Sequence, residues 1–204
     1  MRQSVAIPVY ILLLLALLSC QKQQSSCILP ASVILKPGDV VFRRGGGLAS
    51  RVVVAADRQG NYSHTGIVVD SCGLMMIVHA VPDEHDDGSD SDRIKMDTPE
   101  RFFAKDRATV GEVCRYSDSL LALRASQIAA QMYRRGTAFD HDYDDSDTTR
   151  MYCTELLEYA FARAGHSIAG GRRHTVSLPF LHTRCILPSD IYCSPQLKSI
   201  YAFP

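Results

Sequence analysis

Three side chains have the types that a nucleophilic hydrolase needs: Cys153, His64 and His79. A thiol is mostly protonated at neutral pH, and it becomes a nucleophile when helix amide dipoles or a nearby imidazole stabilise the thiolate. Cys153 precedes a helical apolar pattern that ends before Gly165. We therefore expect Cys153 in the first turn of a helix capped by Thr148 or Thr149, with a stabilised thiolate.

The two histidines lie in a predicted β-hairpin. Residues 64–69 and 74–80 are apolar runs, separated by the turn-forming types Asp70-Ser71-Cys72-Gly73. A reversal centred between Ser71 and Cys72 places His64 directly opposite His79, on the same face of the hairpin, with Cβ atoms about 5 Å apart. One imidazole can then orient and polarise the other, as a base and the group that fixes its tautomer do in cysteine hydrolases.

Other interpretations of these residues are open. A single strand histidine is usually structural, and a single cysteine on an apolar helix face is usually packed or crosslinked. Two histidines and a thiolate could also hold zinc, but no fourth ligand follows at a short spacing. The position of Cys153 at a helix terminus, the pairing of the two histidine strands and the export signal described below occur together, and this combination favours a metal-free hydrolase.

Composition limits the remaining possibilities. The chain has 204 residues, of which 46% are hydrophobic, and this suits one globular domain. Lysine and arginine total 22 and aspartate and glutamate also total 22, so no net positive field would hold a nucleic acid. The function must therefore depend on a local arrangement of side chains and not on the net charge of the protein.

The N-terminal residues have the pattern of an export signal. Arg2 precedes an apolar run from residue 6 to residue 18, which is short for a membrane span. The run ends in Leu17-Leu18-Ser19-Cys20, which resembles the lipobox of bacterial lipoproteins. We expect residues 1–19 to be a lipoprotein signal peptide, residues 20–32 a lipidated Cys20 with a polar tether, and residues 33–204 the folded domain.

An exported chain permits disulfides. Besides Cys20 and Cys153 there are five cysteines, and the sequence does not choose their pairing: Cys27, Cys72, Cys114, Cys185 and Cys193.

Strands and helices alternate along the rest of the chain. A helix capped by Asp118 and running to Arg135 has an apolar stripe, typical of a core-facing helix. Further elements are expected at residues 40–43, 94–97 and 108–115 (strands), at residues 48–58 and from Thr98 (helices), and in the last forty residues (one or two strands).

Four motifs occur in an order that resembles one enzyme family: Pro37–Arg43, Ser63–Val68, Gly136 with Phe139-Asp140, and Tyr152–Leu156. They resemble the YiiX/YebB-like branch of the NlpC-type cysteine peptidases, over residues 33 to 165. In this branch the papain-like chain is circularly permuted, so that histidine precedes cysteine, as His64 precedes Cys153.

The resemblance implies an α+β papain-like fold, with an antiparallel sheet or small barrel packed against helices. It also implies that Cys153 is the nucleophile, His64 the base and then acid, and His79 the orienting third member. Glutamate is frequent at that third position in the permuted branch. Glu155 could substitute, but its helical position points elsewhere and favours a structural ion pair.

The expected activity is that of a peptidase or amidase acting through a thioacyl intermediate without a cofactor. An anchored location in the bacterial cell envelope favours a small peptide, a peptidoglycan fragment or an acylated amino acid as substrate. Hydrolysis of lipid acyl groups or esters is an alternative. So is a noncatalytic envelope binding lipoprotein with a disulfide-stabilised papain-like fold.

Overall fold

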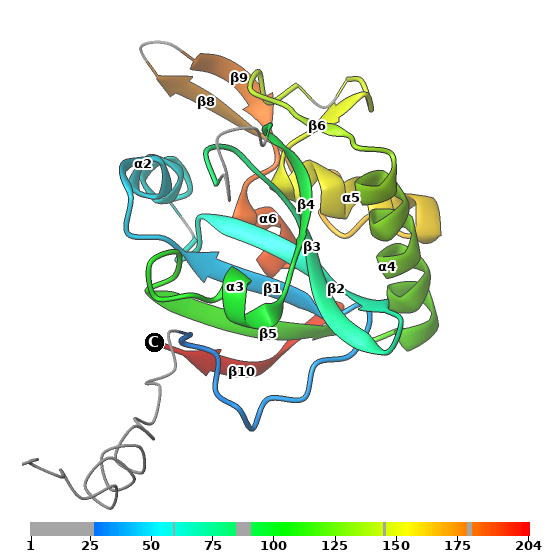
Figure 1. Ribbon diagram of the computed structural model, residues 1–204. Helices are drawn as coiled ribbons and strands as arrows, with labels where there is room; N and C mark the ends of the chain where they lie inside the picture. Colours follow the sequence, from blue (N-terminus) through cyan, green and yellow to red (C-terminus); the bar gives the residue numbers. More distant parts are fainter. Residues whose placement is uncertain (1–26, 59, 85–90, 145, 179–180) are drawn as a thin grey trace, which may run out of the picture.

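The computed structural model describes residues 27–58, 60–84, 91–144, 146–178 and 181–204 (Figure 1). Its main feature is an eight-stranded sheet in the order β10-β5-β1-β2-β3-β4-β6-β7, in which neighbours are antiparallel except for the parallel pair β6 and β7. The strands are β1 (Val40–Arg44), β2 (His64–Ser71), β3 (Leu74–Val81), β4 (Arg93–Asp97), β5 (Val110–Tyr116), β6 (Ala138–Phe139), β7 (Arg150–Met151) and β10 (Leu197–Phe203). Within the described residues β10 and β7 form the two edges, so the fold is the expected antiparallel sheet and not a closed barrel.

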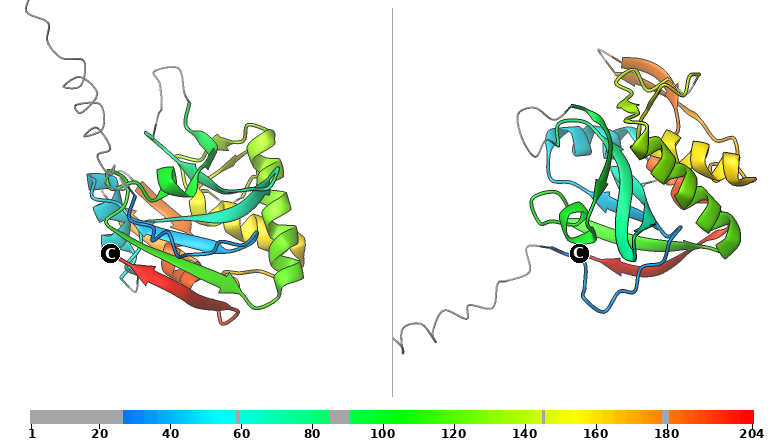
Figure 2. Two further views of the ribbon diagram at one scale, coloured as in Figure 1. Left: turned by 60° about the horizontal axis from the view of Figure 1, so that its bottom comes forward. Right: turned by 45° about the vertical axis from the view of Figure 1, so that its right-hand side comes forward.

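Helices and a second hairpin surround this sheet. The hairpin pairs β8 (His174–Leu178) with β9 (Leu181–Cys185). The helices are α2 (Leu48–Ala56), α3 (Pro99–Phe102), α4 (Ser119–Arg134), α5 (Cys153–Ala164) and α6 (Pro188–Tyr192). Figure 2 shows α4 and α5 side by side on one face of the sheet, where they also contact each other.

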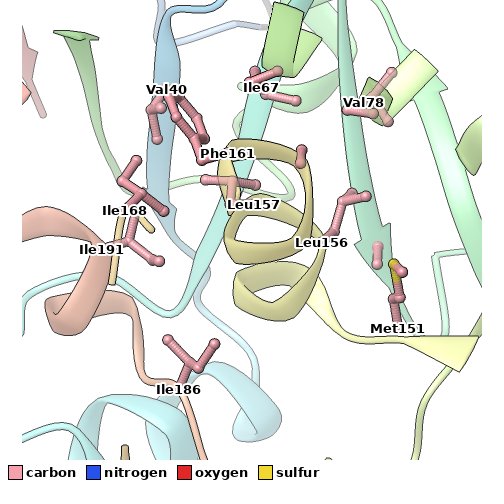
Figure 3. Close-up of a cluster of buried hydrophobic side chains, with 14 of the residues drawn as sticks. Val40, Ile67, Val78, Met151, Leu156, Leu157, Phe161, Ile168, Ile186 and Ile191 are labelled. Carbon is pink, nitrogen blue, oxygen red and sulfur yellow. The ribbon is translucent and has the colours of Figure 1, made fainter. Parts of the chain in front are cut away.

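The sheet has an apolar core on each face, because successive strand residues point to opposite sides. On the α4 and α5 face, Val40 of β1 and Ile67 of β2 belong to the same buried cluster as Leu157 and Phe161 of α5 (Figure 3). On the other face, Val41 packs in a cluster with the rings that follow Pro99 and with the end of β10, namely Phe102, Phe103 and Phe203. Strands β1 to β3 are thus held from both sides.

The β2–β3 hairpin forms with a register that differs from the expected one. Its turn residues are Cys72 and Gly73, with φ values of 56° and 86°. Ile67 therefore pairs with Val78, and not with Met76 as a reversal at Ser71-Cys72 would require. Two-residue hairpin turns with positive φ at both positions favour glycine, and the glycine here follows the cysteine. A shift of two residues preserves the face of every side chain, so His64 and His79 become diagonal neighbours on one face.

The two long helices have different N-terminal caps. For α4 the predicted cap is confirmed: the Asp118 carboxylate accepts hydrogen bonds from the Leu120 and Leu121 amides, each at 3.0 Å. For α5 the prediction of Thr148 or Thr149 is wrong, because the residue before the helix is Tyr152. The Glu155 carboxylate accepts a hydrogen bond from the Tyr152 amide at 3.2 Å. Glu155 thus acts as a cap for the Cys153 helix, a role that we had not expected.

No helix in the described part of the chain is long and apolar enough to cross a bilayer. The predicted signal peptide and Cys20 lie outside the described residues.

Candidate active site

Cys153 is the first residue of α5, as predicted, and it is half-buried, with backbone amides close to its thiol. Burial raises the pKa of the Cys153 thiol to about 11, although hydrogen bonds from the backbone amides of Thr65, Thr154 and Cys153 itself act in the opposite direction. The helix terminus therefore does not produce a resting thiolate, contrary to the expectation from sequence. Desolvation of the charged form outweighs the amide dipoles.

The two predicted histidines are in direct contact. His64 Nε2 lies 2.8 Å from His79 Nδ1, and the ring planes are inclined by 76°. His79 is completely buried, at 0% exposed, and His64 is 8% exposed. Because the Nε2 atom of His64 bonds to His79, its Nδ1 atom is the nitrogen left to accept a proton.

A carboxylate that the sequence did not reveal completes the line of side chains. His79 Nε2 lies 3.2 Å from Asp97 Oδ2. In the β3–β4 pair Ile77 is opposite Asp97 and Lys95 is opposite His79, so His79 and Asp97 are diagonal neighbours on one face. The strand at residues 94–97 was predicted, but its register against β3 was not. A correct prediction of this register would have placed Asp97 beside His79.

Two arginines surround this line. Arg107 Nη1 lies 3.2 Å from Asp97 Oδ2 and 2.7 Å from Glu84 Oε2, and the other oxygen of Glu84 forms an ion pair with Arg43. Arg43 is only 2% exposed and donates to the backbone carbonyl of Phe102 at 2.6 Å. Arg43, Glu84, Arg107 and Asp97 thus form a continuous chain of ion pairs beside the histidines.

The aromatic ring of Phe102 seals the same side of the site. Its centroid lies 5.6 Å from that of His64 and 5.1 Å from that of His79. The Arg43 guanidinium lies over the ring, at 4.6 Å from the centroid. Phe102 therefore packs against both imidazoles and contributes to their burial.

Burial and charge determine the protonation of these groups. Burial, followed by the positive charge of Arg43, holds the pKa of His64 well below its usual range, and burial also lowers the pKa of His79. Burial alone would raise the pKa of Asp97, but the hydrogen bond from His79 and the charge of Arg107 bring it below its ordinary value. At neutral pH the site therefore holds a neutral thiol, two neutral imidazoles and an ionised Asp97.

Cys153 and His64 open into one cavity of about 640 Å³. Near them the lining is charged, with Arg43, Arg107 and Glu84. The lining also includes apolar side chains of α2, β8 and the segment before α6: Leu48, Val52, Val53, Ala56, Val176, Ile186 and Leu187. Charged and apolar side chains thus line the same cavity as Cys153 and His64.

The helix α2 forms one wall of this cavity and stands apart from the sheet (Figure 1). None of its nine residues, all of them described, is buried, and Leu48 is 79% exposed. A second cavity of about 540 Å³ lies between α2 and β8. The helix therefore has open space on two sides.

The alternatives based on metal binding and crosslinking can be compared with this geometry. Within the described ranges, no group of three or more His, Cys, Asp and Glu residues is arranged to hold a metal ion. The thiols of Cys72, Cys114, Cys153 and Cys193 are free. The sulfur of Cys153 is thus available for reaction.

Comparison with known proteins agrees with the fold and the order of these residues. The family model described as "permuted papain-like amidase enzyme, YaeF/YiiX, C92 family" matches residues 34–201. The crystal structure of the metalloprotein YiiX from Escherichia coli O157:H7 is similar with a TM-score of 0.64 and 19% sequence identity, covering 81% of this chain and 96% of that chain. A search of curated proteins gave no match. Because the family model spans most of the sequence, the chain belongs to the YaeF/YiiX (C92) family of permuted papain-like amidases.

Proposed function

We propose that this amidase acts with Cys153 as nucleophile, His64 as base and then acid, and His79 as the residue that orients His64. The contact of 2.8 Å between the histidines, next to a thiol that opens into the same cavity, is the observation that carries the proposal. Since thiol and imidazole are both neutral at rest, His64 removes the thiol proton as sulfur attacks the amide carbonyl.

The proposed reaction has two halves. Attack forms a carbon–sulfur bond, and the amine leaves with the proton that His64 received, which gives a thioacyl enzyme. Water then attacks the thioacyl carbon, with His64 again as base, and releases the acid and the free thiol. We assign the backbone amides of Cys153 and Thr65 as oxyanion donors, because both amides already point toward the sulfur.

The cavity favours an acylated amino acid as the substrate. Its apolar walls suit an acyl chain, which would gain about 0.8 kcal/mol for each buried methylene. A short stem peptide would leave these walls exposed to water. We further propose that the enzyme is exported and anchored through Cys20, so that it meets substrates in the cell envelope.

A substrate series with a trapped intermediate tests both the residue roles and the substrate class. N-dodecanoyl-glycine, N-acetyl-glycine and a γ-linked alanyl-glutamyl-lysine tripeptide are compared by kcat/KM, and acid-quenched enzyme is analysed by peptide mass mapping. We expect the dodecanoyl compound to exceed the acetyl compound by at least about tenfold and to leave a dodecanoyl group on Cys153.

Two variants serve as controls. Cys153→Ala should remove turnover and the adduct, and Cys193→Ala, at an exposed free thiol, should retain both. Turnover by Cys153→Ala would refute the nucleophile assignment. Faster cleavage of the tripeptide than of the dodecanoyl compound would instead favour a cell-wall peptide.

A further inference from the structure

We infer that Asp97 is a positioning residue that sets the tautomers of His79 and His64 in series, and so leaves His64 Nδ1 unprotonated, as its role as base requires. This inference rests on the proposed role of His64 as base. It concerns a residue that touches neither the nucleophile nor, on this mechanism, the substrate.

The hydrogen-bond chain allows one consistent set of protons. An ionised carboxylate only accepts hydrogen bonds, so His79 must donate from Nε2 to Asp97 across 3.2 Å. The Nδ1 atom of neutral His79 is then an acceptor, and His64 must donate to it from Nε2 across 2.8 Å. The remaining nitrogen of neutral His64, Nδ1, carries a lone pair and can accept the thiol proton.

Loss of the Asp97 charge would permit the opposite arrangement. His79 could then carry its proton on Nδ1 and donate it to His64 Nε2. The proton of His64 would move to Nδ1, where it blocks the acceptance of the thiol proton. The Asp97 carboxylate, which acts on His64 through His79, would therefore decide whether His64 can accept the thiol proton.

The surroundings keep this arrangement fixed. His79 is 0% exposed, so bulk water does not reach its Nε2 atom to replace the carboxylate. Arg107 holds the same Asp97 oxygen at 3.2 Å and is itself held by Glu84 at 2.7 Å. Two other charged groups lie near the rings. Arg43 of β1 is opposite His64 of β2. Lys95 of β4 is opposite His79 and donates to the backbone carbonyl of Glu84.

Kinetics of Asp97→Asn provide the first test. A wrong tautomer in the comparable triad of a serine protease lowers kcat by about 10⁴. Because Asp97 acts through an additional ring, we expect kcat to fall by about 10²–10³ with KM within about twofold of the native value. Asp97→Glu should recover part of the loss, since it restores the negative charge.

A double-mutant cycle separates positioning from general structural support. Glutamine has no imidazole tautomer, so in a His79→Gln background the change Asp97→Asn should alter kcat by no more than about twofold. An equal loss from Asp97→Asn in the native and His79→Gln backgrounds would overturn the inference, because the carboxylate would then act independently of the ring.

Nitrogen NMR of histidine-labelled protein tests the tautomers without any substrate. The native protein should show His64 and His79 both protonated on Nε2, and Asp97→Asn should move the proton of each ring to Nδ1. Observation of His64 protonated on Nδ1 in the native protein would overturn the inference even if Asp97→Asn does not fold. Correct tautomers with no turnover of any amide would refute the proposed function alone.

Discussion

His64 Nε2 and His79 Nδ1 lie 2.8 Å apart although the two residues are diagonal neighbours, not opposite partners, on β2 and β3. The two ring planes are inclined by 76°, with the centroids 5.0 Å apart. The far nitrogen of His79 reaches Asp97 of β4.

The low pKa of His64 predicts activity that persists in mild acid. Burial and Arg43 hold this pKa well below 6.5, so the base stays unprotonated as the pH falls through that value. We expect the acid limb of kcat/KM to lie well below pH 6.5. Arg43→Gln removes a positive charge but keeps a donor for the Phe102 carbonyl, and should move that limb to higher pH. A native limb at or above pH 6.5 would contradict the prediction.

At neutral pH the rates of thiol labelling should depend mainly on how exposed each cysteine is. Cys72 and Cys193 are exposed, whereas burial raises the pKa of the Cys153 thiol to about 11. A small neutral alkylating reagent at pH 7 should therefore label Cys72 and Cys193 first, and labelling of Cys153 should accelerate continuously up to about pH 10. Time-resolved mass mapping measures the three rates. Fastest labelling of Cys153 at pH 7 would indicate a resting thiolate.

Gly66 should be required for close packing beside the histidines. A Cβ atom at this position would lie 2.8 Å from Ile77 Cγ2, 3.1 Å from the Val78 carbonyl and 3.2 Å from His79 Cβ. We expect Gly66→Ala to lower the free energy of unfolding by about 1–3 kcal/mol and to displace His79. Gly47→Ala, where a Cβ meets no atom within 4 Å, is the control and should change stability by less than about 0.5 kcal/mol. Denaturant unfolding distinguishes the two.

The predicted lipid anchor is tested by fractionation. Cys20→Ala should release the mature protein from membranes, because a lipid chain on that residue is its expected attachment. The kcat/KM of the released protein should equal that of the native enzyme, since Cys20 precedes the folded domain. If the variant remains membrane-bound after signal cleavage, the lipobox interpretation is wrong.

The elements that carry the site were predictable, but its register and electrostatics were not. Residue types located the hairpin and the Cys153 helix, because turn formers and apolar periodicity are local signals. The choice between Ser71-Cys72 and Cys72-Gly73 as the turn depends on backbone φ values and strand packing. The observed register differs from the expected one by two residues, an even number, so both histidines remain on one face of the sheet. The predicted contact therefore forms although the predicted register was wrong.

Asp97 and the protonation of Cys153 depend on the assembled molecule. Asp97 meets His79 through the pairing of β3 with β4, which are separated by a loop whose length does not fix a register. The thiol pKa depends on how completely the packed domain removes water from one helix end. The rule that helix N-termini stabilise thiolates correctly predicts that backbone amides lower the pKa of Cys153. It does not include desolvation, which raises this pKa by more.

The exposed helix α2 gives the enzyme a region in which specificity can evolve at low cost. A substitution in a core strand changes the folding free energy and the site together, but no α2 residue is buried, so changes there mainly alter the cavity wall. Chain-length preference could therefore drift between relatives, or be selected in the laboratory, while the catalytic centre remains intact. A library restricted to Leu48, Val52 and Ala56 would explore substrate selectivity with few unfolded members.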